Sequence, residues 1–321
     1  MRFSAFCVAL LVGFTALAAP IKVGITQIVD HPALNAVRQG VIDILSEAGY
    51  VEGEDVQYLL GNAQGDFSVA MSIAQNFLAQ GVDLVVAIAT PTAQAAVQVF
   101  KDTDVPIVFS AVTDPVGAGL TAYANVTGTS DLIDVKADLE LLKKLVPGLK
   151  RLGMVYNPGE ANSAILTDMA IAAGKEMGME IIAAAAENTA AVPLAAQSLI
   201  GRVEAIYCTT DNTVASALEA VVDAAKEASL PFLMADPTSL ERGALVCTGF
   251  DYYDHGRLAG QVVLAILQGK SPADIPVQYQ KGTQVWLNLD MASEMGFSFP
   301  QEAKEAATGL LFGGRRFVLQ G

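Results

Sequence analysis

Short apolar runs alternate with longer segments of helical periodicity along most of the chain, and this rhythm occurs twice. Apolar runs of about 4–8 residues are typical of strands buried in a parallel sheet. Apolar positions three and four residues apart are typical of helices that pack on such a sheet. The order of the segments therefore predicts an α/β protein with two doubly wound parallel-sheet lobes.

Each repeat of the rhythm predicts its own set of strands and helices. In the first, the strands are Ile21–Thr26, Val56–Leu60, Leu84–Ala89 and Pro106–Ala111, and the helices are Leu34–Ala48, Ser68–Gln80 and Thr92–Phe100. In the second, the strands are Arg151–Tyr156, Glu180–Ala184, Ala205–Cys208, Pro231–Met234 and Ala244–Cys247, and the helices are Asn162–Met177, Val192–Gly201 and Val214–Ala228. Later in the chain we expect a helix at Tyr252–Gln268, a strand around Val285–Leu289, a short helix around Met291–Met295 and a loose terminus after Gly309.

Polar, turn-rich stretches indicate where the chain passes between the lobes, and three such crossovers are expected. They lie at 124–130, 248–251 and 271–276. The resulting division is residues 20–128 with about 250–272 in the N-terminal lobe, 129–249 in the C-terminal lobe, and 273–321 as a tail that crosses between the lobes. The pattern does not assign this tail to one lobe.

The first nineteen residues have the features of a Sec-type signal peptide. Arg2 precedes an apolar run from Phe6 to Leu17, and small residues follow the run. Cleavage is expected near Ala18 or Ala19, which would release a soluble periplasmic protein; a retained N-terminal anchor is the alternative. Cys7 lies inside the apolar run instead of after it, which argues against a lipoprotein anchor.

Composition narrows the possible functions. The formal charge of −15 argues against nucleic-acid or anionic-membrane binding, because both need a basic surface. The chain has only two histidines and shows no metal-ligand spacing, nucleophile elbow or phosphate loop. Residues 24–39 also lack the glycines of a dinucleotide site. We therefore expect no metal, no cofactor and no enzymatic activity.

Cys208 and Cys247 end the third and fifth strands of the second lobe. In the doubly wound order 2-1-3-4-5 the fourth strand lies between them. Two strand spacings separate such residues by roughly 9–10 Å, which exceeds the limit of about 7 Å for bridged Cα atoms. We expect two buried thiols, with a disulfide as the alternative.

Candidate binding residues follow the carboxyl ends of the predicted strands, where open parallel sheets bind ligands. In the first lobe these are His31, Thr90, Thr92, Thr113 and Asp114. Helix-end N–H groups and the hydroxyls near Thr90 would suit an anion. Each residue also has an ordinary structural alternative: Thr90 could cap its own helix, Asp114 could form a turn before a proline, and His31 could be structural.

The second lobe places Asn157, Asp211, Asn212 and Asp236 at the same kind of position. An aspartate there could pair with a ligand ammonium group, and closure of the lobes would strengthen the pair by excluding water. The alternatives are a helix cap for Asp211 and a turn for Asp236. Four aromatic residues near the crevice could stack on a ligand or serve only in packing: Tyr156, Phe250, Tyr252 and Tyr253.

Several motifs jointly resemble a known family, the TrpX-like substrate-binding proteins of ABC transporters, which have a type I periplasmic-binding-protein fold. The resemblance covers nearly all of the mature chain and rests on the segments His31–Leu34, Ala87–Gln94, Thr113–Ala118, Asn125–Gly128 and Thr210–Ser216. It implies capture of a small molecule by hinge closure and delivery to an ABC permease with a cytoplasmic ATPase. Some members bind aromatic amino acids.

If that ligand carries over, Thr90 and Thr92 would hold its carboxylate, Asp211 with Asn212 its amino group, and Asp236 would be a second polar anchor. The sequence thus favours a monomeric periplasmic solute-binding protein for an amino acid, with Phe, Tyr or Trp preferred. Two other classes remain open: a ligand-sensing domain of the same fold that reports to a signalling partner, and a secreted enzyme with two Rossmann-like lobes.

Overall fold

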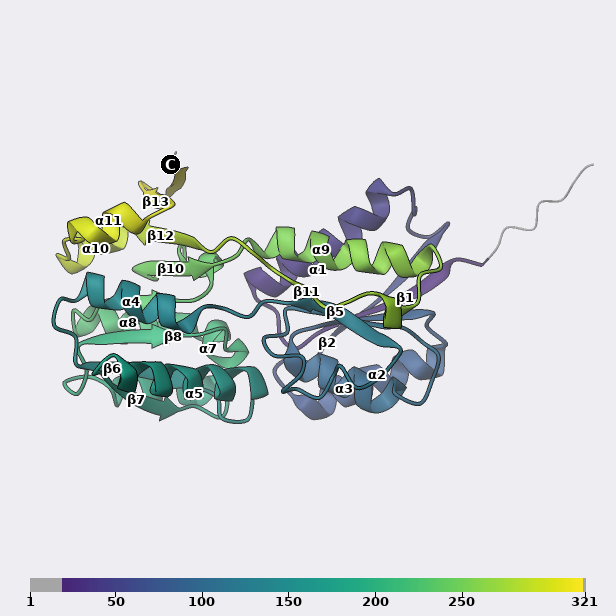
Figure 1. Cartoon of the computed structure of the whole chain (residues 1–321), viewed down its shortest axis with the longest axis horizontal. Helices are drawn as coiled ribbons and strands as arrows, with labels where there is room; N and C mark the ends of the chain where they lie inside the picture. Colours follow the sequence, from purple (N-terminus) through teal and green to yellow (C-terminus); the bar gives the residue numbers. More distant parts are fainter. Residues whose placement is uncertain (1–18, 320–321) are drawn as a thin grey trace, which may run out of the picture.

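The computed structural model describes residues 19–319, so nearly all of the expected signal peptide lies outside the described residues. Two lobes lie side by side, each built on its own sheet (Figure 1). The N-terminal lobe contains β1 Ile21–Gln27, α1 Pro32–Glu47, β2 Val56–Asn62, α2 Phe67–Gln80, β3 Leu84–Ile88, α3 Thr90–Phe100, β4 Ile107–Ser110, β5 Val126–Ser130, α9 Tyr252–Leu267 and β11 Gln278–Tyr279.

The C-terminal lobe contains the remaining helices and strands. These are α4 Val135–Leu145, β6 Arg151–Tyr156, α5 Ala161–Glu176, β7 Glu180–Ala185, α6 Val192–Gln197, β8 Ala205–Cys208, α7 Asn212–Ser216, α8 Leu218–Glu227, β9 Phe232–Met234, β10 Val246–Gly249, β12 Gln284–Asn288, α10 Leu289–Met295, α11 Gln301–Ala306, β13 Gly309–Phe312 and β14 Arg315–Val318. Short 3₁₀ turns occur at Thr189–Ala191, Pro237–Ser239 and Pro272–Asp274.

Strand order confirms the predicted pair of doubly wound lobes. The six-stranded sheet has the order β11-β5-β4-β3-β1-β2, and its paired strands are parallel. The eight-stranded sheet has the order β14-β13-β12-β10-β9-β8-β6-β7. Its first five strands along the chain are parallel, whereas β12 pairs antiparallel with β10.

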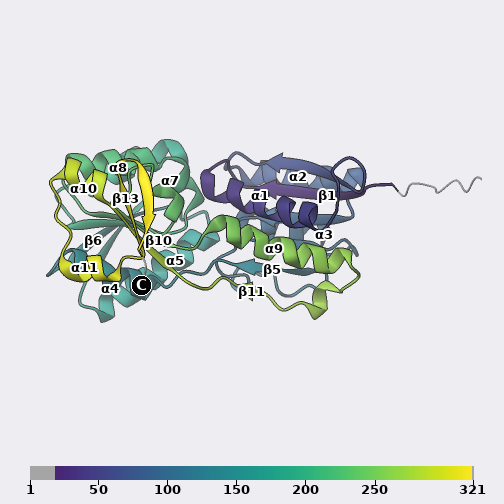
Figure 2. The ribbon, with the colours of Figure 1, turned by 90° about the horizontal axis from the view of Figure 1, so that it is seen from above.

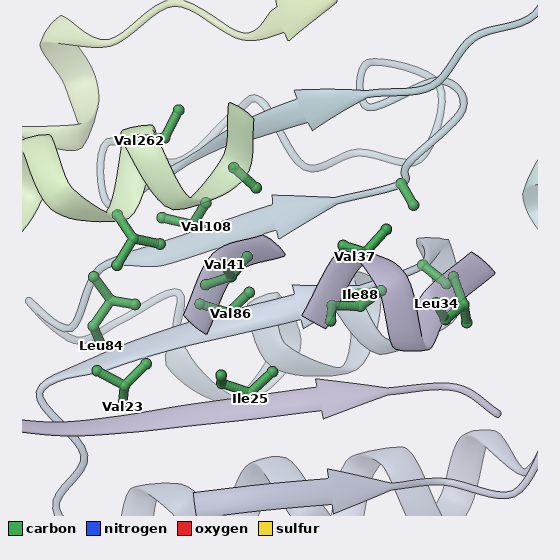
Figure 3. Close-up of a cluster of buried hydrophobic side chains, with 14 of the residues drawn as sticks. Val23, Ile25, Leu34, Val37, Val41, Leu84, Val86, Ile88, Val108 and Val262 are labelled. Carbon is green, nitrogen blue, oxygen red and sulfur yellow. The ribbon is translucent and has the colours of Figure 1, made fainter. Parts of the chain in front are cut away.

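Both faces of the N-terminal sheet are buried, which explains the continuous apolar runs of its strands. Leu84, Val86 and Ile88 of β3 face the core under α1 and α9, whereas Val85 and Ala87 face the core under α2 and α3. This alternation follows from the two-residue period of a strand. Figure 3 shows the first of these cores, with side chains of β1, β3, β4, α1 and α9 in contact.

Helix α9 packs directly on α1, although more than two hundred residues separate them in the chain (Figure 2). Glycines allow this close approach. A Cβ atom added at Gly256 would lie 2.2 Å from the carbonyl oxygen of Val37, and one added at Gly40 would lie 2.4 Å from that of Tyr253. The backbones of the two helices are therefore nearly in contact, and a segment that follows β10 of the C-terminal sheet completes the N-terminal lobe.

The chain passes between the two sheets at 131–134, 250–251 and 280–283. The first passage corrects an expectation, because much of 124–130 is not a flexible crossover but the buried strand β5. Its polar residues tolerate burial because their hydroxyls are bonded: Thr127 Oγ1 donates to the Ile275 carbonyl at 2.7 Å and Ser130 Oγ to the Thr113 carbonyl at 2.9 Å.

The expected third crossover at 271–276 is also wrong. These residues form a 3₁₀ turn at Pro272–Asp274 and lead into β11, which pairs with β5 in the N-terminal sheet. The passage comes several residues later, between β11 and β12. The proline-rich composition therefore marked a turn within one lobe, since proline favours turns whether or not the chain changes lobes.

The expectation of a loose terminus after Gly309 is wrong as well, because β13 and β14 form a hairpin on the C-terminal sheet. The Arg316 guanidinium stacks over the Trp286 ring at 5.0 Å and donates to the Glu241 carboxylate at 2.5 and 2.6 Å. The backbone N–H groups of Gly313 and Gly314 each donate to Asp290 at 2.8 Å. These contacts hold a segment whose composition alone resembles a flexible tail.

The prediction of two free cysteines is confirmed, because Cys208 and Cys247 are buried thiols and β9 lies between their strands. Within residues 19–319, no helix is both long and apolar enough to cross a membrane.

Replacement of Gly256 by alanine tests the contact between α1 and α9. Alanine in a helix normally stabilises it by roughly 0.5–1 kcal/mol relative to glycine. Here the added methyl group would overlap the backbone at Val37. We expect Gly256→Ala to lower the free energy of unfolding by about 1–3 kcal/mol in urea denaturation. A stabilised variant would contradict the close contact.

Asp138 and Tyr207 form a buried pair in the C-terminal lobe, in which the Tyr207 hydroxyl donates to the Asp138 carboxylate at 2.7 Å. Burial raises the pKa of Asp138 to about 6. A raised pKa means that the folded chain binds this proton more tightly than the unfolded chain does. The contribution of Asp138 to stability therefore increases as the pH falls from about 7 toward 4.

Comparison of Asp138→Asn with the unsubstituted protein isolates this effect, because the amide does not titrate. Between pH 8 and pH 5 we expect the unsubstituted protein to gain stability relative to the variant by on the order of 1 kcal/mol. Urea denaturation at both pH values measures the difference. A difference in unfolding free energy between the two proteins that does not change with pH would show that Asp138 titrates normally.

Candidate ligand-binding site

A small pocket lies between the two lobes. Residues from both lobes and from the first passage line it. They are His31, Ala33, Leu34, Ala111, Thr113 and Tyr252 of the N-terminal lobe, Asp131 of the passage, and Asn162, Thr210, Asp211, Asn212, Ala215, Met234 and Asp236 of the C-terminal lobe. Most of the polar residues among them follow the carboxyl ends of strands, as expected for doubly wound sheets.

Asp211 is buried in the pocket wall and accepts three hydrogen bonds. Its Oδ1 accepts from Val214 N at 2.8 Å and so caps α7, while its Oδ2 accepts from Asn157 N at 2.6 Å and from Ser163 Oγ at 2.5 Å. Burial, reinforced by the nearby Glu160 carboxylate, raises the pKa of Asp211 to about 7. The cap that sequence reasoning left as an alternative is therefore present.

Asp236 also lines the pocket but is bonded within its own turn. Its carboxylate accepts from the Thr238 N–H at 2.8 Å, from the Thr238 hydroxyl at 2.8 and 2.9 Å, and from the Ser239 hydroxyl at 3.2 Å. Pro237 begins the 3₁₀ turn that these bonds close. The turn interpretation of Asp236 therefore holds, and its side chain nevertheless faces the pocket.

Asp131 is a third buried carboxylate in the pocket, and sequence reasoning missed it. It accepts from the Thr113 hydroxyl at 3.4 Å and from the Tyr252 hydroxyl at 3.1 Å. Burial raises the pKa of Asp131 to about 6. The available signal was an aspartate directly after a strand, but it was hidden because the strand Val126–Ser130 was interpreted as a crossover.

Asn162 and Glu160, at the start of α5, were also not among the candidate residues predicted from the sequence. Asn162 Nδ2 donates to the Thr210 carbonyl at 2.8 Å, and its Oδ1 has no hydrogen-bond partner among the described residues. Glu160 accepts from Asn212 Nδ2 at 2.5 Å and from Thr213 Oγ1 at 2.7 Å. Asn212 therefore reaches the pocket, but its amide is bonded to a neighbouring carboxylate. A polar helix start after Pro158 was the only signal in the sequence.

The structure brings Thr113 and His31 into the pocket from the N-terminal lobe. The Thr113 and Thr210 hydroxyls lie 3.5 Å apart across the boundary between the lobes. His31 precedes α1, and burial lowers its pKa, opposed by the Asp236 carboxylate. Its Nδ1 has no hydrogen-bond partner within the described part of the chain.

Three of the predicted first-lobe residues lie outside this pocket. The alternative that Thr90 caps its own helix is wrong, because α3 begins at Thr90 and Ala89 occupies the cap position. The Thr92 hydroxyl donates within its own helix, to the Ile88 carbonyl at 2.5 Å. Asp114 accepts from the Gly117 N–H at 2.9 Å and so forms a turn. Thr90 and Asp114 line a neighbouring cavity between the lobes.

Asn157 lines a wider cleft beside the pocket instead of the pocket itself. Its Nδ2 donates to Thr213 Oγ1 at 2.8 Å and its Oδ1 accepts from Gly159 N at 2.8 Å, so its side chain organises the loop after β6. Among the four candidate aromatic residues, Tyr252 lines the pocket, whereas Tyr253 donates to Asp43 on the surface.

Two features of the pocket bear on its chemistry. None of its lining residues is a lysine or arginine, whereas three are aspartates. No group of His, Cys, Asp or Glu within residues 19–319 is arranged to hold a metal ion. The pocket is therefore rich in hydrogen-bond acceptors and lacks a fixed cation among its lining residues.

Two doubly wound lobes, three connecting passages and a polar pocket between the lobes define a type I periplasmic binding protein. The family model described as "ABC transporter substrate binding protein" matches residues 22–309. The chain belongs to this family of ABC transporter substrate-binding proteins.

The chain is similar to three proteins whose descriptions name a ligand or a conformational state. A tyrosine-binding protein of Clostridioides difficile is 38% identical over 274 residues, which are 84% of this chain and 79% of that protein. The ABC domain in complex with L-Trp from Streptococcus pneumonia has a TM-score of 0.85 at 31% identity, over 91% of this chain and 100% of that one. A ligand-free, open substrate-binding protein with adhesive properties from Clostridium difficile has a TM-score of 0.66 at 37% identity, over 89% and 98%.

The TM-score is higher with the L-Trp complex than with the ligand-free, open protein, although the sequence identity is lower. The contact between Thr113 and Thr210 across the boundary agrees with a closed arrangement.

Replacement of Asp211 by alanine tests its structural role. The change removes the cap of α7 and leaves the buried Asn157 N–H without this acceptor. We expect the ligand-free protein to lose on the order of 2 kcal/mol of unfolding free energy. Asp114→Ala, which affects only a partly exposed turn, is the matched control and should cost less than about 1 kcal/mol. Equal losses in urea denaturation would contradict the network.

Proposed function

We propose that this protein is the extracytoplasmic solute-binding component of an ABC importer. It captures an amino acid, with an aromatic one favoured, when its two lobes close about the hinge. It then presents the closed form to a permease driven by a cytoplasmic ATPase, and it performs no catalysis. One observation carries the proposal: an acceptor-rich pocket lies on the boundary between the lobes, with polar side chains contributed by both.

The polar groups of the pocket suit a zwitterion. Asp131 and the Oδ1 of Asn162, which has no hydrogen-bond partner within residues 19–319, are acceptors that an ammonium group would satisfy. The hydroxyls of Thr113 and Thr210 and the ring of His31 can donate to a carboxylate. This differs from the carboxylate site expected at Thr90 and Thr92, because the Thr92 hydroxyl is bonded within its own helix.

The apolar part of the pocket supports an aromatic side chain for the ligand. Leu34, Met234 and the Tyr252 ring contribute apolar surface, and methionine adapts readily to different ring shapes. A tyrosine-binding relative and a related domain in complex with L-Trp point in the same direction.

Closure provides the signal for transport. A ligand that contacts both lobes binds the closed form more tightly than the open form, and this difference in affinity shifts the population toward closure. The three passages at 131–134, 250–251 and 280–283 are short, so the lobes can rotate while each keeps its own core.

A thermal-shift screen of the mature protein tests the proposal. The ligands are the twenty amino acids, small carboxylates and sugars. At 100 times its Kd a ligand adds about 2.7 kcal/mol of stability, which for a chain of this size raises Tm by roughly 4 °C. We expect this shift with Tyr, Trp or Phe, and a smaller radius of gyration in X-ray scattering with the same ligand.

A shift with sugars alone would contradict an amino-acid ligand. Uptake of the radiolabelled ligand in cells with and without the gene tests transport. Unchanged uptake in the deletion strain would contradict a role in import and favour ligand sensing.

A further inference from the structure

Three aspartates line the pocket, and their hydrogen bonds differ in a way that separates their roles. From these differences we infer that Asp131, on the first passage between the lobes, binds the ammonium group of the ligand. The inference rests on the proposed capture of an amino acid. Asp131 takes the role for which the sequence favoured Asp211.

Asp211 and Asp236 have little acceptor capacity left. An ionised carboxylate offers about four acceptor positions. Asp211 uses three of them in bonds of 2.5–2.8 Å, two of them to backbone N–H groups that cannot turn away. Asp236 accepts from one N–H and two hydroxyls within its own turn. A ligand that took either carboxylate would compete with bonds that hold the fold.

Asp131 has acceptor capacity to spare. Its two side-chain partners, the hydroxyls of Thr113 and Tyr252, lie at 3.4 and 3.1 Å, longer than the usual 2.7–2.8 Å of such bonds. Both partners are hydroxyls, whose hydrogens can rotate toward another acceptor. The carboxylate is nevertheless buried and lines the pocket. An ammonium group would supply the strong, charge-assisted donors that this buried carboxylate lacks.

The position of Asp131 also suits a residue that reports binding to the hinge. It begins the passage 131–134, and Tyr252 begins α9 directly after the passage 250–251. From the C-terminal lobe, Asn162 offers its Oδ1, which has no hydrogen-bond partner among the residues that the structure describes, in the same pocket. An ammonium group shared between Asp131 and Asn162 would connect the first passage to the C-terminal lobe.

Paired ligands provide the test. Affinities of L-tyrosine and L-tryptophan are measured by calorimetry beside those of 3-(4-hydroxyphenyl)propionate and indole-3-propionate, which lack the amino group. The unsubstituted protein should prefer the amino acids. Asp131→Asn should weaken amino-acid binding by about 30-fold or more, as expected for loss of one partner of a buried charged pair. Affinity for the deaminated analogues should change little, so the preference should nearly disappear.

Asp138→Asn is the matched control, because Asp138 is equally buried, has a tyrosine hydroxyl as partner, and lies outside the pocket. Its amino-acid preference should equal that of the unsubstituted protein. Tyr252→Phe removes one hydroxyl from Asp131 and keeps the charge, so the preference should survive. Asp131→Ser is a second neutral variant that should behave like Asp131→Asn. Circular dichroism checks the folding of each variant.

The outcomes separate the two proposals. If the unsubstituted protein binds no amino acid, the proposed function fails. If it binds one and Asp131→Asn keeps the preference, the function stands and the inference is wrong. Asp211→Asn and Asp236→Asn keep the test decisive even where the Asp131 variants do not fold. Loss of the preference in either, with the affinity for the deaminated analogues unchanged, would overturn the inference, and its retention in both would support it.

Discussion

The Asp211 carboxylate is the interaction on which the pocket depends. It connects the end of β6, the start of α5 and the start of α7, through Asn157 N, Ser163 Oγ and Val214 N. The three bonds offset the cost of burying the carboxylate only in part, since burial still raises its pKa to about 7. Because α5 carries Asn162 and the loop before α7 carries Thr210, the same carboxylate sets one wall of the pocket.

The opposite wall depends on a segment that crosses from the other lobe. Helix α9 follows β10 of the C-terminal sheet but packs on α1 through Gly40 and Gly256. This contact positions Tyr252, whose hydroxyl reaches Asp131, and His255, whose Nε2 accepts from the Ala111 N–H at 3.0 Å. Burial lowers the pKa of His255 to about 4, so the ring stays a neutral acceptor at physiological pH. The neutral His255 ring therefore bonds α9 to the end of β4 at Ala111.

The pocket thus combines two kinds of buried carboxylate. Asp211 and Asp236 stabilise local structure, whereas Asp131 has long bonds to hydroxyls that can turn away. The distinction explains how an acidic pocket can be stable without its ligand and still respond to one. Asp211 and Asp236 are bonded within the C-terminal lobe, whereas Asp131 lies on the passage between the lobes and can gain a new partner.

The sequence by itself determined the fold class, the doubly wound order of the strands that it predicted, the free thiols and most of the elements, because apolar periodicity depends only on which faces are buried. It also placed His31, Thr113, Asp211 and Asp236 correctly after strand ends, although it left their hydrogen-bond partners undetermined. Only the tertiary structure decided that 126–130 is a buried strand, that the last residues form a hairpin, and that Asp131 and Asn162 enter the pocket. In each case the deciding bonds join residues far apart in the chain, such as Thr127 to Ile275 or Arg316 to Glu241, and local composition carries no record of them.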